Sequence, residues 1–163
     1  MKDLINKLNK NTQIQISGEK SIVKTKTWYS IEEDITVSYV KCELSNNKVL
    51  VIIPEDELIY VGSVTENMNY ERISKDKIKY NNSFFSKTGE GHQFIIRIEF
   101  GNEDEIEGKC IFEDYESESN IISLGILPDK GNVKADVYAE IINLDDIKII
   151  MWKLVKEKIW ISM

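Results

Sequence analysis

Apolar and polar residues alternate with a period of two along most of residues 12–142, and this pattern constrains the fold more than any other feature of the chain. Successive side chains of a β-strand point to opposite faces, so the alternation is typical of strands with one buried face. It is clearest in residues 133–141, where Val, Ala and Ile alternate with Lys, Asp, Tyr and Glu. Helical spacing is confined to residues 1–10 and to an ambiguous C-terminal stretch.

Turn-forming residues divide the chain into short predicted strands, among them residues 12–17, 20–30 and 120–127. Gly18, residues 45–47 (Ser-Asn-Asn) and residues 128–131 (Pro-Asp-Lys-Gly) favour the backbone conformations of tight turns. Pro54 has no N–H to donate to a neighbouring strand, so it predicts a strand end. The sequence therefore predicts a mainly β fold, an antiparallel β-barrel or β-sandwich, with short terminal helices.

Residues 65–92 are the least regular part of the chain, being polar and containing four Asn and two Gly. We expect short strands and a flexible loop there. The same stretch is the expected boundary between two half-sheets inside a single domain that spans residues 1–163. A Lys-Cys step occurs in each half, at residues 41–42 and 109–110, which suggests that the half-sheets are related.

Two further local features carry predictions. The alternation changes phase within residues 34–44, as a β-bulge would produce. Asn143, followed by Asp145 and Asp146, can cap a helix. Residues 147–151 fit a helix face or a last strand, and we expect a strand first, followed by a short helix or tail.

Several segments of the chain resemble uncharacterised bacterial all-β domains of unknown function. The resemblance extends over most of residues 12–150. It implies a small accessory domain and assigns no active-site residue. The segments that carry it are Tyr39–Leu44, Val49–Ile53, Phe112–Tyr115, Val137-Tyr138 and Leu144–Ile147.

The N-terminus has no apolar core or small-residue cleavage site typical of a secretory signal. No run approaches the ~20 apolar residues of a membrane-spanning helix. We therefore expect a cytoplasmic protein with no membrane span, in which Cys42 and Cys110 are buried, reduced thiols.

The net charge is −7, and residues 99–118 hold nine acidic residues and one Lys. A chain this acidic is unlike a nucleic-acid-binding protein, because such binding neutralises phosphates with Lys and Arg. An acidic surface would instead steer a basic protein partner. The uses left open are a Ca²⁺ site without EF-hand spacing, paired carboxylates for glycoside chemistry, and a charged edge that keeps the protein soluble. The predicted partner-binding residues are Glu103, Asp104, Glu105, Glu107, Asp114, Glu116 and Glu118.

No phosphate-binding loop, metalloprotease motif, nucleophile elbow or C-x-x-C pair occurs in the sequence. His92, the one histidine, lies in the expected loop at residues 88–92. We expect it to be more exposed than the core, to lack a carboxylate partner at hydrogen-bond distance, and to be dispensable. The sequence therefore favours a non-enzymatic interaction domain, of the kind that toxin-neutralising immunity proteins represent, with no cofactor and no metal. A carrier of small apolar ligands inside a barrel is the first alternative. A hydrolase that uses the acidic cluster is the second.

Overall fold

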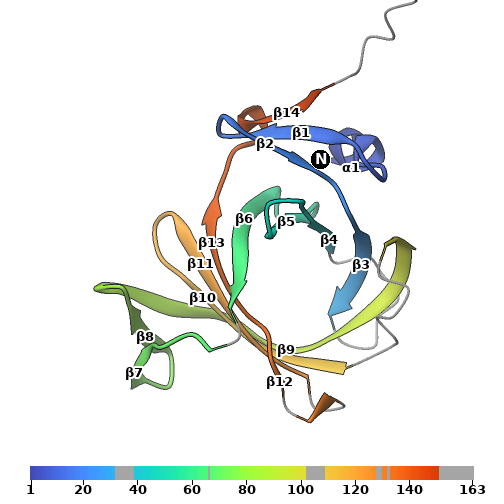
Figure 1. Ribbon diagram of the computed structural model, residues 1–163. Coiled ribbons are helices and arrows are strands. Elements are labelled where there is room, and N and C mark those ends of the chain that lie inside the picture. The colour runs from blue at the N-terminus through green and yellow to red at the C-terminus, as the bar shows by residue number, and fades with distance from the viewer. Residues whose placement is uncertain (32–38, 66, 102–108, 128–129, 132, 151–163) are drawn as a thin grey trace, which may run out of the picture.

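The computed structural model describes residues 1–31, 39–65, 67–101, 109–127, 130–131 and 133–150, and these residues form antiparallel sheets with one short α-helix (Figure 1). No helix among them has the length and apolar character needed to cross a membrane. The elements are α1 (Lys2–Lys7), β1 (Gln13–Ile16), β2 (Glu19–Ile22), β3 (Lys26–Ile31), β4 (Tyr39–Glu43), β5 (Lys48–Ile53), β6 (Leu58–Thr65), β7 (Glu71–Ser74), β8 (Lys77–Tyr80), β9 (Ser83–Phe100), β10 (Lys109–Glu116), β11 (Asn120–Leu127), β12 (Val133–Lys134), β13 (Asp136–Ile141), the 3₁₀ turn η2 (Leu144–Asp146) and β14 (Ile147–Ile150).

Eight of these strands close into an antiparallel barrel. The order around the barrel is β3-β4-β5-β6-β13-β11-β10-β9, and β9 pairs with β3 to complete the circle. The barrel is thus built from two four-stranded meanders, β3–β6 and β9–β13, joined at the β6–β13 and β3–β9 seams. The predicted mainly β fold is confirmed, and it is a barrel.

Local backbone chemistry explains the hairpins and one seam. Asn47 takes a positive φ of 61° in the turn between β4 and β5, and Gly18 takes 91° between β1 and β2, as the turn predictions require. Strand β5 ends directly before Pro54, also as predicted. At the β6–β13 seam, a Cβ on Gly62 would lie 2.2 Å from the carbonyl oxygen of Tyr138, so only glycine lets the two backbones approach this closely.

A small sheet packs against the outer face of the first meander. Strands β14, β1 and β2 form this sheet, and α1 lies beside it (Figure 1). Its apolar residues share one hydrophobic core with the outward side chains of β4, β5 and β6. The buried members are Leu4, Ile5, Leu8, Ile14, Ile16, Val23, Val40, Cys42, Leu44, Leu50, Ile52, Ile59 and Ile142.

A second, smaller core lies on the outside of the other meander. There the β7–β8 hairpin continues the sheet from β9, and Ile78 of β8 packs against the outward residues Phe85 and Tyr115. Ile122, Leu124 and Met68 complete this core. Both hydrophobic cores therefore lie outside the barrel wall.

Two predicted boundaries were wrong. Residues 20–30, predicted as one strand, form β2 and β3, because the chain leaves the small sheet and enters the barrel between Ile22 and Lys26. Residues 88–92, predicted as a flexible loop, belong to β9, which begins at Ser83. Gly89 and Gly91 have ordinary strand neighbours: a Cβ at either position would lie 3.8 or 3.6 Å from the ring of Phe112 on β10.

The C-terminal prediction was right as far as the structure describes the chain. The Asn143 N–H donates a hydrogen bond to Asp146 Oδ2 at the start of η2, and β14 then pairs with β1. The predicted change of phase within residues 34–44 lies partly outside the described residues. Strand β4 follows the alternation of the later residues in this range, which places Val40 and Cys42 on the outer face.

Candidate functional site

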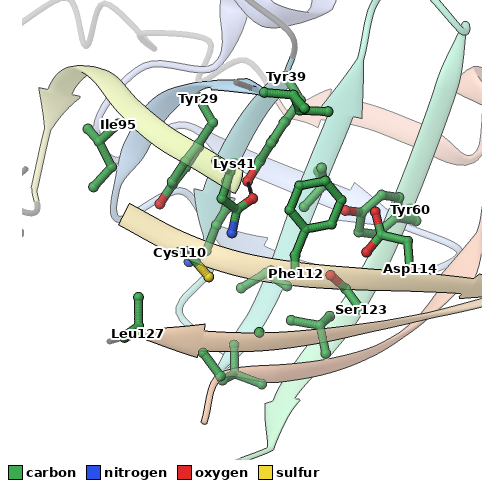
Figure 2. A pocket seen from close by; sticks show the side chains of 18 of the residues that line it. Tyr29, Tyr39, Lys41, Tyr60, Ile95, Cys110, Phe112, Asp114, Ser123 and Leu127 are labelled. Atoms are coloured by element: carbon green, nitrogen blue, oxygen red, sulfur yellow. Dashed lines mark hydrogen bonds between the residues drawn. The ribbon is translucent and has the colours of Figure 1, made fainter. Parts of the chain in front are cut away.

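The interior of the barrel encloses a cavity of about 520 Å³ (Figure 2). This volume falls within the usual range of small-molecule sites, about 300–1,000 Å³. Inward positions of both meanders line the cavity: Tyr29, Ile31, Tyr39, Lys41, Glu43, Val49, Val51, Ile53, Tyr60, Val64, Gln93, Ile95, Cys110, Phe112, Asp114, Ser123, Gly125, Leu127, Lys130, Ala135 and Val137.

The period of two along each strand separates the cavity from the outer cores. On β5, Val49, Val51 and Ile53 line the cavity, whereas the intervening Leu50 and Ile52 are fully buried in the outer core. Alternate residues of β4 and β11 likewise line the cavity or pack into an outer core. Because the outer faces pack against the small sheet and the hairpin, folding does not require the interior to be filled.

Small residues on the second meander make the interior hollow. Ser123, Gly125 and Ala135 all line the cavity. A Cβ on Gly125 would lie 2.9 Å from the carbonyl oxygen of Ala135 and 3.4 Å from Cys110 Sγ, so a larger residue does not fit there without a backbone shift. On β9, Gly89 and Gly91 place no side chain on the barrel wall beside the Phe112 ring. A ligand site inside a barrel was the first alternative predicted from the sequence, but no lining residue was named for it, although the glycines at alternate positions were a visible signal.

Aromatic side chains face the cavity from the first meander. The rings of Tyr29 and Tyr39 stack with their centroids 4.8 Å apart and an interplanar angle of 4°. The Tyr39 hydroxyl donates a hydrogen bond to the side-chain carbonyl of Gln93. Burial raises the pKa of Tyr39 and of Tyr60, so both phenols stay neutral and can donate hydrogen bonds. The Lys41 ammonium lies 5.9 Å from the centre of the Tyr29 ring, within cation–π range.

Asp114 contributes a partly buried carboxyl group to the same cavity. Its Oδ1 atom is enclosed and has no hydrogen-bond partner among the described residues. Burial raises the pKa of Asp114 to about 6, against a hydrogen bond from Ser123 that lowers it, and the nearby negative charge of Glu116 raises it further. The carboxyl group therefore titrates near neutral pH, at a position that faces the hollow interior.

The structure describes three of the seven predicted partner-binding residues, Asp114, Glu116 and Glu118. Glu103, Asp104, Glu105 and Glu107 lie outside the described residues. Asp114 lines the cavity, and the partly buried Glu116 follows two positions later on the same face of β10, while Glu118 is exposed. An acidic face that binds a basic protein therefore stays a prediction.

The neighbouring Glu113 points outward and already has cationic partners. Its carboxylate lies 2.7 Å from Arg72 Nη2 and 2.7 Å from Lys87 Nζ. Burial alone would raise the pKa of Glu113, but the hydrogen bonds from Lys87 and Arg72 outweigh burial and lower it to about 2. Two adjacent carboxyl groups thus have opposite environments on the two faces of one strand.

The remaining candidate residues show no catalytic arrangement. His92 is half-buried in an outer groove beside Arg72 and Glu113, and no described carboxylate lies within hydrogen-bond distance of it. Cys42 and Cys110 are buried and unbonded, as predicted. Burial raises the pKa of Cys42 to about 12 and also raises that of Cys110. Within the described part of the chain, no three His, Cys, Asp or Glu side chains are placed to hold a metal ion.

Comparisons of this chain with protein-family models, with curated proteins and with solved structures found no match. The resemblance to uncharacterised bacterial all-β domains therefore stays a prediction.

Proposed function

We propose that this protein binds a small molecule with a largely apolar body inside its barrel. One observation carries the proposal: the interior holds a cavity of about 520 Å³, while both hydrophobic cores lie outside the wall. An eight-stranded barrel is just wide enough for its own side chains to fill it or for one small ligand to occupy it. Here glycine, alanine and serine leave one side of the interior unfilled.

The free-energy cost of an empty cavity supports the same conclusion. Unfilled volume destabilises a folded protein because the lining atoms lose van der Waals contacts. The outer faces of β4 and β5 are packed so closely that Val40, Leu50 and Ile52 have no exposed surface. A chain that packs so closely outside the wall and leaves its interior open fits a protein whose interior is completed by a ligand.

The character of the lining also favours ligand binding. Ligand sites combine apolar and aromatic walls with a few polar groups that orient the ligand. Val51, Ile95 and Phe112 supply apolar contacts, while Gln93 and Asp114 supply polar ones. His92 lies on the outer surface, and the raised pKa of Cys110 leaves its thiol protonated, so we propose binding without catalysis.

Binding of a neutral, polarity-sensitive dye tests the proposal. Nile red should bind the purified protein with a stoichiometry of one, and its emission should shift to the blue. Val137→Phe places a ring in the cavity and should weaken dye binding by about tenfold, equivalent to ~1.4 kcal/mol. Val133→Phe is the matched control, because Val133 is 50% exposed and lies outside the cavity.

Circular dichroism should show that both variants retain the β-sheet spectrum of the wild type. Equal dye affinity for Val137→Phe and the wild type would place the dye elsewhere. Failure of the wild type to bind any apolar dye would contradict the proposed function.

A further inference from the structure

One part of the cavity carries negative charge that no described cation offsets. Asp114 and Glu116 lie on the inner face of β10, and no described Lys or Arg nitrogen lies within 4.0 Å of either carboxylate. The Ser123 side chain supplies a hydrogen bond to Asp114, and Oδ1 of Asp114 has none. An enclosed carboxylate oxygen without a hydrogen-bond partner is costly, and a donor brought by a ligand would remove that cost.

The cations that line the cavity lie elsewhere. The charge of Lys41 acts on Cys110, and Figure 2 shows Lys41 beside Cys110, with the Phe112 ring between Lys41 and Asp114. The charge of Asp114 also acts on Cys110, but no Lys or Arg is among the groups that shift the pKa of Asp114. Lys130 lines the cavity as well, three residues after the end of β11. The described cations of the cavity therefore leave the charge of Asp114 without a partner.

We propose that Asp114 accepts a hydrogen bond from a protonated amine, so that the preferred ligands of the cavity are small amines with an apolar or aromatic body. This inference rests on the proposed function, because it assigns one group of the ligand to one end of the site. A charged hydrogen bond between an ammonium and a carboxylate is stronger than a neutral one. The Phe112 and Tyr60 rings beside Asp114 would contact the body of such a ligand (Figure 2).

The protonation of Asp114 makes the preference dependent on pH. With a pKa of about 6, the carboxyl group is ionised at neutral pH and becomes neutral as the pH falls below 6. Tyr39, Tyr60 and Cys110 have raised pKa values and stay uncharged at neutral pH. Several other titratable or charged groups face Asp114 or share the cavity with it. They are Glu116 and Cys110 on β10, Tyr60 on β6, Tyr29 on β3, Tyr39, Lys41 and Glu43 on β4, and Lys130 after β11.

Three ligands that share one aromatic body test the assignment. Naphthylmethylamine, naphthylmethanol and naphthylacetate are each titrated against the protein with bound Nile red, and their dissociation constants are obtained from dye displacement. At neutral pH the amine should bind about tenfold more tightly than the alcohol, and the acetate should bind most weakly. Below pH 6 the advantage of the amine over the alcohol should disappear.

Asp114→Asn should reduce the affinity for the amine to that for the alcohol and leave alcohol binding within about threefold of the wild type. Glu113→Gln is the matched control, because Glu113 is adjacent in sequence and faces outward; this variant should keep the amine preference.

The experiment distinguishes failure of the amine assignment from failure of the proposed function. Equal affinity of the wild type for amine and alcohol, or tightest binding of the acetate, would overturn the amine assignment and leave the proposed binding site intact. An amine preference that survives in Asp114→Asn would also overturn it. If neither Nile red nor any naphthyl compound binds, the proposed function fails, and the assignment of Asp114 fails with it.

Discussion

The two faces of the barrel wall differ although the same strands form them. On the outer face of the first meander, Val40, Leu50 and Ile52 have no exposed surface and pack against the small sheet. On the inner face, the intervening positions hold Tyr39, Lys41 and other residues of mixed polarity around a hollow. The usual arrangement of a small barrel, with an interior filled by side chains, is therefore reversed here.

This difference teaches where stability and binding are located in the molecule. Side chains of the outer face are enclosed on all sides, so their removal leaves cavities that the surroundings fill only partly. Side chains of the inner face already border a void. Their removal enlarges this void but disrupts less packing than the removal of an outer-face side chain. The inner face can therefore carry polar and charged groups that a packed core would not accommodate.

The largest expected effect comes from two valines on paired strands. Val40 of β4 faces outward with 0% exposure, whereas Val51 of β5 lines the cavity. Val40→Ala should lower the free energy of unfolding by about 2–3 kcal/mol, because two enclosed methyl groups are lost. Val51→Ala should lower it by about 1 kcal/mol, because one side of that side chain already faces a void. Urea denaturation of both variants measures the difference.

The matched substitution makes this a direct test, since the change in side-chain volume is identical. Equal losses would mean that the interior is packed as tightly as the outer core. A ligand retained through purification would produce the same result, so native mass spectrometry should accompany the measurement.

A smaller effect, of opposite sign on the two faces, is expected from pH. The pKa of Glu113 is lowered to about 2 by its cationic partners, so it contributes stability above its unfolded value near 4.5 and loses it as the pH falls toward 2. The pKa of Asp114 is raised to about 6, so its ionisation costs stability above pH 6, and this cost is relieved as the pH falls toward 3.8.

Two substitutions isolate these contributions. At neutral pH, Asp114→Asn should raise the free energy of unfolding by about 1–2 kcal/mol, and Glu113→Gln should lower it by about 1 kcal/mol after allowance for solvent screening. The gain in Asp114→Asn should fade by pH 4, and the loss in Glu113→Gln should fade between pH 4.5 and 2. Urea midpoints measured across this range provide the check. The same sign of change in both variants at neutral pH would show that the two carboxyl groups share one environment.

The fold was largely predictable because the period of two is a local property. Strand β11 spans Asn120–Leu127, which is the predicted apolar segment that ends directly before the turn residues at 128–131. The start of β9 was not predictable in the same way, because Gly89 and Gly91 favour a loop until Phe112 of another strand covers them. That contact depends on the pairing of β9 with β10, which no local pattern specifies.

The candidate site was less predictable than the fold. Alternation tells which residues share a face, but not whether that face encloses a core or a cavity. Val49, Val51 and Ile53 are as apolar as the neighbouring core residues and nevertheless line a void. Asp114 was grouped with surface acids because its neighbours in sequence are acidic, whereas the closed barrel turns it inward. Closure of the sheet, which decides both cases, is a property of the whole chain.

The smallest effect is expected at His92, which lies on the outer face directly before an inward residue. His92 lines the outer groove and makes no hydrogen bond to a described carboxylate, while the next residue, Gln93, bonds the Tyr39 hydroxyl inside the cavity. His92→Ala should therefore change the free energy of unfolding by less than about 0.5 kcal/mol and leave Nile red affinity unaltered. Gln93→Ala should weaken dye binding measurably, because it leaves the Tyr39 hydroxyl without its acceptor. Loss of binding in His92→Ala with retention in Gln93→Ala would move the ligand from the interior to the outer groove.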